Sequence, residues 1–117
     1  MTDWKFDLED RLVKFAGDTI LFTRSFPGSS EGKYFVDQLV RASSSAALNF
    51  GEAQGTKTNK DFSDKLTIVL REIKECRVAF KILDYLNIGD NGERARLIDE
   101  SEQLSAIFYS IQNKSDN

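Results

Sequence analysis

The residue types that usually perform catalysis are scarce in this sequence. Histidine is absent from all 117 residues. Its absence removes the commonest general base, the Ser–His and Cys–His nucleophile pairs, and the Glu-x-x-His ligands of di-iron bundles. Three carboxylates on otherwise inward-facing rows, Glu52, Glu72 and Glu75, leave an all-carboxylate metal site as the one catalytic alternative. Arginines nearby favour ion pairs instead, so we expect neither an enzyme nor a cofactor.

Cys76 is the single cysteine, which excludes an internal disulfide. It lies in an apolar seam between Ile73 and Phe80, where a thiol usually acts as a small core residue. A reactive thiol needs exposure and a positive neighbourhood. Arg77 is adjacent in sequence, but consecutive residues of a helix point in different directions. The sequence therefore predicts a buried, structural cysteine.

A polar stripe recurs every three or four residues and so shares one face of a helix. Its members are Gln38, Arg41, Ser45, Asn49 and Glu52. Burying such groups costs free energy unless each is paired, and the usual benefit is a fixed register between helices. We therefore predict an internal, structural polar layer in which the stripe satisfies itself or the carboxylates of Glu72 and Glu75. In particular, Arg41 is expected to contact one of these two carboxylates.

Basic residues gather on the segment 57–81. Lys60, Lys74 and Lys81 share one heptad position, and Arg77 follows Lys74 by three residues. This row is the candidate contact for RNA or DNA. The segment 90–102 has the opposite, acidic bias, and exposed aromatic residues are not interleaved with the row. Solvated faces or attraction between subunits are therefore the favoured interpretation.

Four amphipathic segments must position these residues, because apolar residues step by three and four along each of them. The segments are residues 5–26, 31–54, 58–87 and 92–112. The N-terminal capping signals are Ser29 or Ser30, Thr58 with Asp61, and Asp90 with Glu93. Connections are short and no stretch alternates like a strand. We therefore predict an all-α, antiparallel up-and-down four-helix bundle that forms a single domain over residues 1–117.

The first segment carries a second apolar row, Phe6, Val13 and Ile20, beside its main one. Two rows make its apolar face wider than a single seam. The favoured interpretation is a broad core stripe, and the alternative is a contact with another subunit.

Composition limits the classes of partner. The formal net charge is −3, which argues against coating nucleic acid by bulk electrostatics. The N-terminus lacks the basic start and apolar run of a signal peptide, and no stretch approaches the ~20 apolar residues of a membrane helix. We expect a cytoplasmic protein without a membrane partner.

The residues on the second and third segments resemble a known family. The pattern is Gln38-x-x-Arg41-x-x-x-Ser45-x-x-x-Asn49-x-x-Glu52-Ala53, then Lys60-Asp61-Phe62-x-x-Lys65-x-x-Ile68-x-x-x-Glu72-x-x-Glu75. It is similar to the bacterial four-helix-bundle proteins, also called intervening-sequence proteins because some are encoded within insertions in large-subunit ribosomal RNA genes. The resemblance implies a bundle that assembles into a ring, typically a homopentamer, with no established enzyme activity.

One branch of that family, the accessory variability determinant of diversity-generating retroelements, binds nucleic acid through a strongly basic surface. This sequence departs from that branch in its net negative charge. It also has Ala46 where a β-branched residue is usual, and Val78-Ala79 where aromatic residues often follow the paired glutamates.

Three functional hypotheses follow. The leading one is a non-enzymatic, self-associating helical scaffold, a homo-oligomer. The alternative is an RNA- or DNA-binding accessory protein that uses Lys60, Lys74, Arg77 and Lys81. A carboxylate metal enzyme is the third.

Overall fold

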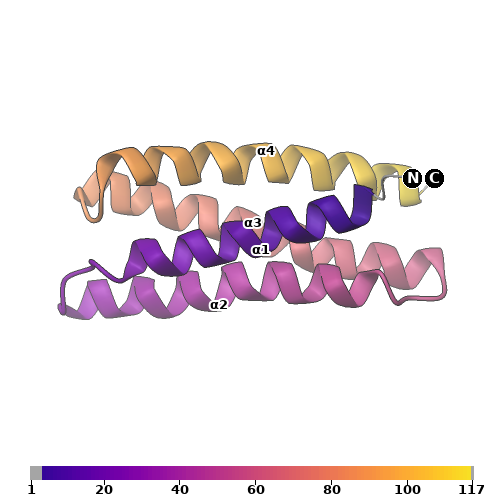
Figure 1. The fold of residues 1–117 in the computed structure, drawn as a ribbon, viewed down its shortest axis with the longest axis horizontal. Helices are drawn as coiled ribbons and strands as arrows, with labels where there is room; N and C mark the ends of the chain where they lie inside the picture. Colours follow the sequence, from indigo (N-terminus) through magenta and orange to yellow (C-terminus); the bar gives the residue numbers. More distant parts are fainter. Residues whose placement is uncertain (1–3, 117) are drawn as a thin grey trace.

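Four helices make up the part of the chain that the computed structural model describes, residues 4–116 (Figure 1). They are α1 (Trp4–Thr23), α2 (Ser30–Ala53), α3 (Asn59–Leu86) and α4 (Asn91–Asp116). No strand occurs within these residues. Each helix runs antiparallel to the next and packs along it, as Figure 1 shows. The predicted all-α four-helix bundle is confirmed. Within the described helices, no segment is long and apolar enough to span a membrane.

The apolar rows of all four helices meet in one core. Fully buried side chains are contributed by every helix, among them Phe15, Phe50, Phe80 and Phe108. Phe80 of α3 stands edge-on to Phe15 and Phe22 of α1, with ring centroids 6.3 and 5.9 Å apart. Such edge-to-face pairs add to the free energy gained from burying the rings. Helix α1 packs extensively on α2 and much less on α4, so the α1–α4 side of the bundle is the least tightly packed.

The three capping signals fix where helices begin. The Ser29 hydroxyl accepts a hydrogen bond from the Gly32 amide at 3.2 Å, and the Thr58 hydroxyl accepts one from the Asp61 amide at 3.0 Å. The Asp90 carboxylate accepts one from the Glu93 amide at 2.8 Å. Each satisfies an amide that has no partner within its helix, and an N-cap of this kind stabilises a helix by about 1 kcal/mol.

Two helix ends differ from the sequence prediction. Helix α1 stops at Thr23 rather than residue 26, because the chain must become extended before Pro27. Helix α4 continues to Asp116 rather than ending at 112. Its last turns are held by the Gln112 side chain, which donates hydrogen bonds to the Ser63 carbonyl, at 3.3 Å, and to the Thr67 hydroxyl of α3.

The second apolar row of α1 is not a core stripe. Val13 is 57% exposed and Ile20 is half-buried, while the side chain of Phe6 lies outside the described residues. Val13 faces outward because α1 already buries Leu12, Phe15 and Thr19 on its inner side. The favoured interpretation of a broad core stripe was therefore wrong for Val13.

The connection between α3 and α4 is a tightly specified turn. Asn87 ends α3 with φ of 57°, and Gly89 has φ of 83°, both in the left-handed region. Arg94 of α4, only 3% exposed, donates hydrogen bonds to the carbonyls of Ile88, at 2.6 Å, and Gly89, at 3.0 Å, and to the carboxylate of Asp84 at 2.9 Å. A single guanidinium thus satisfies the carbonyls that the turn would otherwise leave unpaired.

Replacing Gly89 with alanine should destabilise the protein. A Cβ there would lie 2.5 Å from Cζ of Phe22, and the backbone conformation itself disfavours an L side chain. We expect the free energy of unfolding to fall by about 2–3 kcal/mol, measured by urea denaturation at fixed protein concentration. Gly28→Ala is the matched control, because a Cβ at Gly28 meets nothing within 4 Å. Equal stability of the two variants would contradict this account of the turn.

Candidate functional site

The polar cluster centred on Arg41 joins α2 to α3. Nη1 of Arg41 donates a hydrogen bond to Oε2 of Glu72 at 2.8 Å, and Nη2 donates to the Glu75 carboxylate and, at 3.3 Å, to Oε1 of Gln38. Glu72 is buried, at 4% exposure, while the Arg41 side chain is half-exposed. The predicted contact between Arg41 and the paired glutamates is therefore present. It supplies the buried carboxylate with a charged donor that reaches in from the surface.

In the rest of the polar stripe, Ser45 and Asn49 are half-buried and hydrogen-bond to one another, whereas Glu52 is more exposed than predicted. Asn49 is half-buried, and its amide donates to the Ser45 carbonyl at 2.9 Å and hydroxyl at 3.0 Å, within α2 itself. The Glu52 side chain is 61% exposed and accepts a hydrogen bond from Lys65 at 3.2 Å. The stripe follows the solvent edge of the α2–α3 contact, and the carboxylate that reaches the interior there is Glu72 of α3. The prediction of an internal polar layer containing Glu52 was wrong.

The three candidate metal-binding carboxylates do not converge. Arg41 binds Glu72 and Glu75, whereas Glu52 pairs with Lys65. Among residues 4–116 with described side chains, no group of three or more acidic or cysteine ligands is arranged to hold a metal ion. The geometry of these carboxylates suits ion pairing between helices.

Cys76 is fully buried in the core. Burial raises the pKa of the Cys76 thiol to about 12, and the negative charges of Glu75 and Glu72 act in the same direction. At neutral pH the thiol therefore stays protonated, and a protonated thiol is neither a nucleophile nor a metal ligand.

The basic row is partly neutralised by the protein's own acids. Lys60 pairs with Asp64 at 2.7 Å, and Arg77 lies 4.0 Å from the Glu102 carboxylate of α4. Lys74 and Lys81 are exposed on α3 and enter no ion pair in the described structure. Two of the four candidate nucleic-acid contacts are therefore without an ion-pair partner among the described residues.

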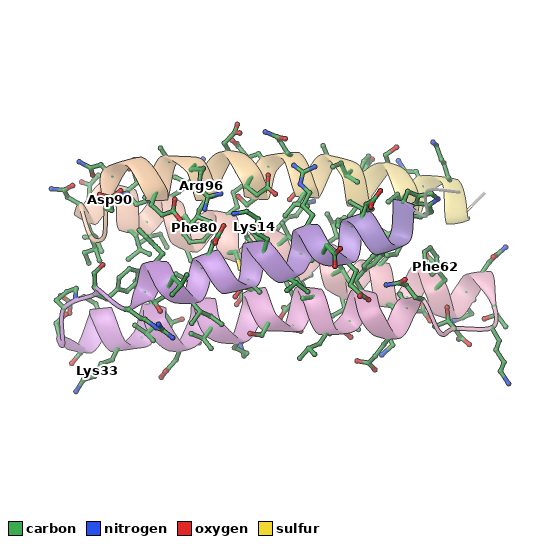
Figure 2. The ribbon with its side chains drawn as sticks, in the orientation of Figure 1. Lys14, Lys33, Phe62, Phe80, Asp90 and Arg96 are labelled. Atoms are coloured by element: carbon green, nitrogen blue, oxygen red, sulfur yellow. The ribbon has the colours of Figure 1, made fainter. Side chains whose placement is uncertain are left out.

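The contact between α1 and α4 is bridged by charged side chains, a pairing that was not predicted from the sequence. Arg11 binds Glu100 through two hydrogen bonds of 2.8 Å, and Arg96 donates one of 2.8 Å to Asp18. Lys14 also binds Asp18, at 2.6 Å, and both Lys14 and Arg96 are visible between α1 and α4 in Figure 2. Burial opposes the ionisation of Asp18, but the hydrogen bonds from Lys14 and Arg96 outweigh it and hold the pKa of Asp18 below its ordinary value.

Large apolar side chains on the outer surface are the other feature that the sequence reading largely missed. They lie on all four helices, and the most exposed is Tyr85 at 91%. The remainder, each between 42% and 66% exposed, are Trp4, Val13, Leu21, Tyr34, Leu48, Val78, Ile82, Leu86 and Tyr109. Most of these residues do not belong to a row that was predicted to face the core. In the sequence they could be recognised only by their position on the polar side of each helix.

Comparison with known proteins places the chain in a family. Residues 5–110 match the model of the 23S rRNA-intervening sequence protein family. The chain belongs to this family. The earlier resemblance to intervening-sequence proteins is thereby confirmed.

A solved structure has the same fold. It is the crystal structure of a protein of unknown function from the S23 ribosomal protein family of Bacteroides thetaiotaomicron. The two share 21% sequence identity and superimpose with a TM-score of 0.81, over 93% of this chain and 97% of the other. No curated protein matches the sequence. The comparisons thus establish the family and the fold of this chain. Neither of the two matched descriptions names an activity.

Replacing Arg41 with methionine should leave the Glu72 carboxylate buried without its closest donor. We expect the free energy of unfolding to fall by about 1–3 kcal/mol, because a buried charge retains its desolvation penalty when its partner is lost. Urea denaturation followed by circular dichroism at fixed protein concentration measures the change.

Lys65→Met is the matched control for Arg41→Met, since it removes the cation from the exposed Glu52 and should cost at most about 0.5 kcal/mol. Adding Glu72→Met to Arg41→Met should restore much of the lost stability. An unchanged denaturation curve and particle size in Arg41→Met would rule out a structural role for the pair.

Proposed function

We propose that this member of the intervening-sequence family is a non-enzymatic cytoplasmic scaffold that associates with copies of itself, as the homopentameric ring that the family resemblance implies. In this proposal the protein acts through its outer surface. The core and its polar edge serve to hold that surface in one shape.

The observation that carries the proposal is the amount of apolar side chain left outside the core. Leu48 is 66% exposed, Val13 and Leu21 are each 57% exposed, and Tyr85 is 91% exposed. Monomeric soluble proteins seldom expose large continuous apolar patches, and such patches commonly mark interaction sites. Tyrosine in particular is enriched where proteins contact one another.

The described side chains also give little support to a catalytic role. The candidate carboxylates are engaged by Arg41 and Lys65, and the Cys76 thiol is buried and protonated. Histidine, the commonest general base at neutral pH, is absent from the sequence.

Light scattering coupled to size exclusion tests self-association directly. The chain has a mass of 13.3 kDa, and we expect a single species whose mass is an integral multiple of this value, five-fold for a ring of five. Because burial of apolar surface drives association, the species should persist at high salt. A particle of one chain mass at about 100 µM protein would refute the scaffold proposal.

The competing hypothesis, nucleic-acid binding, is favoured by one observation, the exposure of Lys74 and Lys81 without an ion-pair partner among the described residues. Filter binding of RNA and DNA at several salt concentrations distinguishes the two. If all four of Lys60, Lys74, Arg77 and Lys81 contact phosphates, the log–log salt slope should be about −3 to −4.

We expect no binding at moderate salt, because Asp64 and Glu102 already compensate two of the four cations. A variant with Lys74→Ala and Lys81→Ala controls for residual binding. A steep slope that this variant loses would support the nucleic-acid hypothesis over the scaffold.

A further inference from the structure

Asn91 and Gly92 begin helix α4, and nowhere else in the sequence does an asparagine precede a glycine. Asparagine is chemically labile, because the backbone nitrogen of the next residue can attack its side-chain amide and close a succinimide ring. A side chain on that next residue obstructs the attack, and glycine has none. Both residues are exposed to solvent. The other asparagines within the chain precede a large side chain; they are Asn49, Asn59, Asn87 and Asn113.

The attacking nitrogen, that of Gly92, is not occupied by a hydrogen bond. It lies in the first turn of α4, where backbone amides have no carbonyl partner one turn back in the helix. The Asp90 carboxylate accepts a hydrogen bond from the Glu93 amide at 2.8 Å, and the Asp90 carbonyl accepts one from the Arg94 amide at 2.9 Å. Within residues 4–116 the Gly92 amide has no such acceptor. Hydroxide from solvent can therefore remove its proton.

The group under attack, the side-chain amide of Asn91, is already polarised by a cation. Arg94 is only 3% exposed, and its Nη2 donates a hydrogen bond to Oδ1 of Asn91. Attack at Cγ places negative charge on this oxygen, and a cationic donor bound there stabilises the developing charge. The α3–α4 turn thus holds together an unhindered nucleophile, a polarised carbonyl and access for water.

We propose that Asn91 is a site of spontaneous covalent modification, in which its side-chain amide is converted to a carboxylate through a succinimide formed with Gly92. The deprotonated Gly92 nitrogen bonds to Cγ of Asn91, and the Cγ–Nδ2 bond breaks. The leaving group takes up a proton and departs as ammonia. Water then opens the ring. Cleavage between Cγ and the ring nitrogen gives aspartate, whereas cleavage between the backbone carbonyl carbon and that nitrogen gives isoaspartate.

The two products act on the α3–α4 turn in opposite directions. Aspartate at residue 91 places a carboxylate beside the Arg94 guanidinium and at the positive end of the α4 dipole, and both interactions are stabilising. Isoaspartate instead lengthens the backbone by one methylene group between Asp90 and Glu93. That insertion separates the capping carboxylate from the amide it satisfies. Isoaspartate formation should therefore loosen the start of α4.

Peptide mass spectrometry of the folded protein, incubated for weeks at mildly alkaline pH, tests the proposal. We expect the amide-to-acid mass change to accumulate at Asn91 ahead of Asn59 and Asn113, and its rate to rise with pH because hydroxide removes the Gly92 proton. An isoaspartate-specific methyltransferase should label the same peptide. Equal accumulation at Asn59 and Asn91 would overturn the assignment of the site.

Gly92→Ala is the matched control for the attack. A Cβ at residue 92 would lie 3.4 Å from its nearest neighbour, Oδ2 of Asp90, so the fold accommodates it. The added methyl group obstructs the approach to Cγ of Asn91, and we expect the rate there to fall at least ~10-fold. An unchanged rate in this variant would show that the Gly92 nitrogen is not the nucleophile, and the proposal would fail.

Protein kept in concentrated urea is the reference for the effect of the fold. Modification of Asn91 in urea but not in the folded protein would mean that α4 protects the site, and this result would also refute the proposal. Asn91→Asp reproduces one product and should melt at or above the wild-type temperature, while the purified isoaspartate form should melt below it. The reverse order would contradict the effects assigned to the two products. None of these outcomes depends on whether the chain associates with copies of itself.

Discussion

The alignment of α2 with α3 depends on one constraint, the need of the buried Glu72 carboxylate for a charged donor. Glu72 occupies a row of α3 that faces α2, where it has lost nearly all contact with water. Arg41 is its closest cation, at 2.8 Å. A slip of one helical turn would move the two about 5 Å apart and leave the buried carboxylate with only the more distant Arg71, at 3.8 Å on its own helix. An apolar seam alone tolerates such slips more readily, because its residues repeat.

This alignment has consequences on the outside of the molecule. Tyr34 and Ile82 are far apart in sequence, and they share a surface because Arg41 meets Glu72 and Glu75 on the inner side of the same contact. The polar cluster thus shapes the outer surface, since it determines which exposed side chains of α2 and α3 are neighbours. The polar cluster and these exposed side chains belong to one arrangement of α2 against α3.

Much of this structure could be predicted from the sequence. Helical periodicity revealed four helices, and the side chains of Ser29, Thr58 and Asp90 were recognisable as caps because capping depends on residues only three apart. The contact between Arg41 and the glutamates was also predictable. A charged residue on an inward-facing row needs a partner, and the partner must lie on the facing helix.

The parts that could not be predicted depend on which neighbour covers each side chain. Val13 continues an apolar row, but the neighbouring helices leave it in solvent. Glu52 continues a polar row that seemed to face inward, yet it lies at the solvent edge of the α2–α3 contact, where Lys65 of α3 reaches it. Arg94 looked like an ordinary surface residue, and its buried position follows only from the path of the α3–α4 turn, whose carbonyls it satisfies. Periodicity determines the face of a helix; it does not determine how far each neighbour covers that face.

The uneven closure of the bundle explains why the outer face of α1 carries apolar residues. Helix α1 is held to α2 by an apolar contact and to α4 by charged bridges from Arg11 and Arg96. Charged bridges at the surface contribute little stability, so this side of α1 gains less from folding than the α2 side does. In a single copy, the exposed Val13 and Leu21 gain nothing from burial. A neighbouring copy covering them would stabilise α1 where the bundle itself does so least, and assembly would then complete the packing of α1.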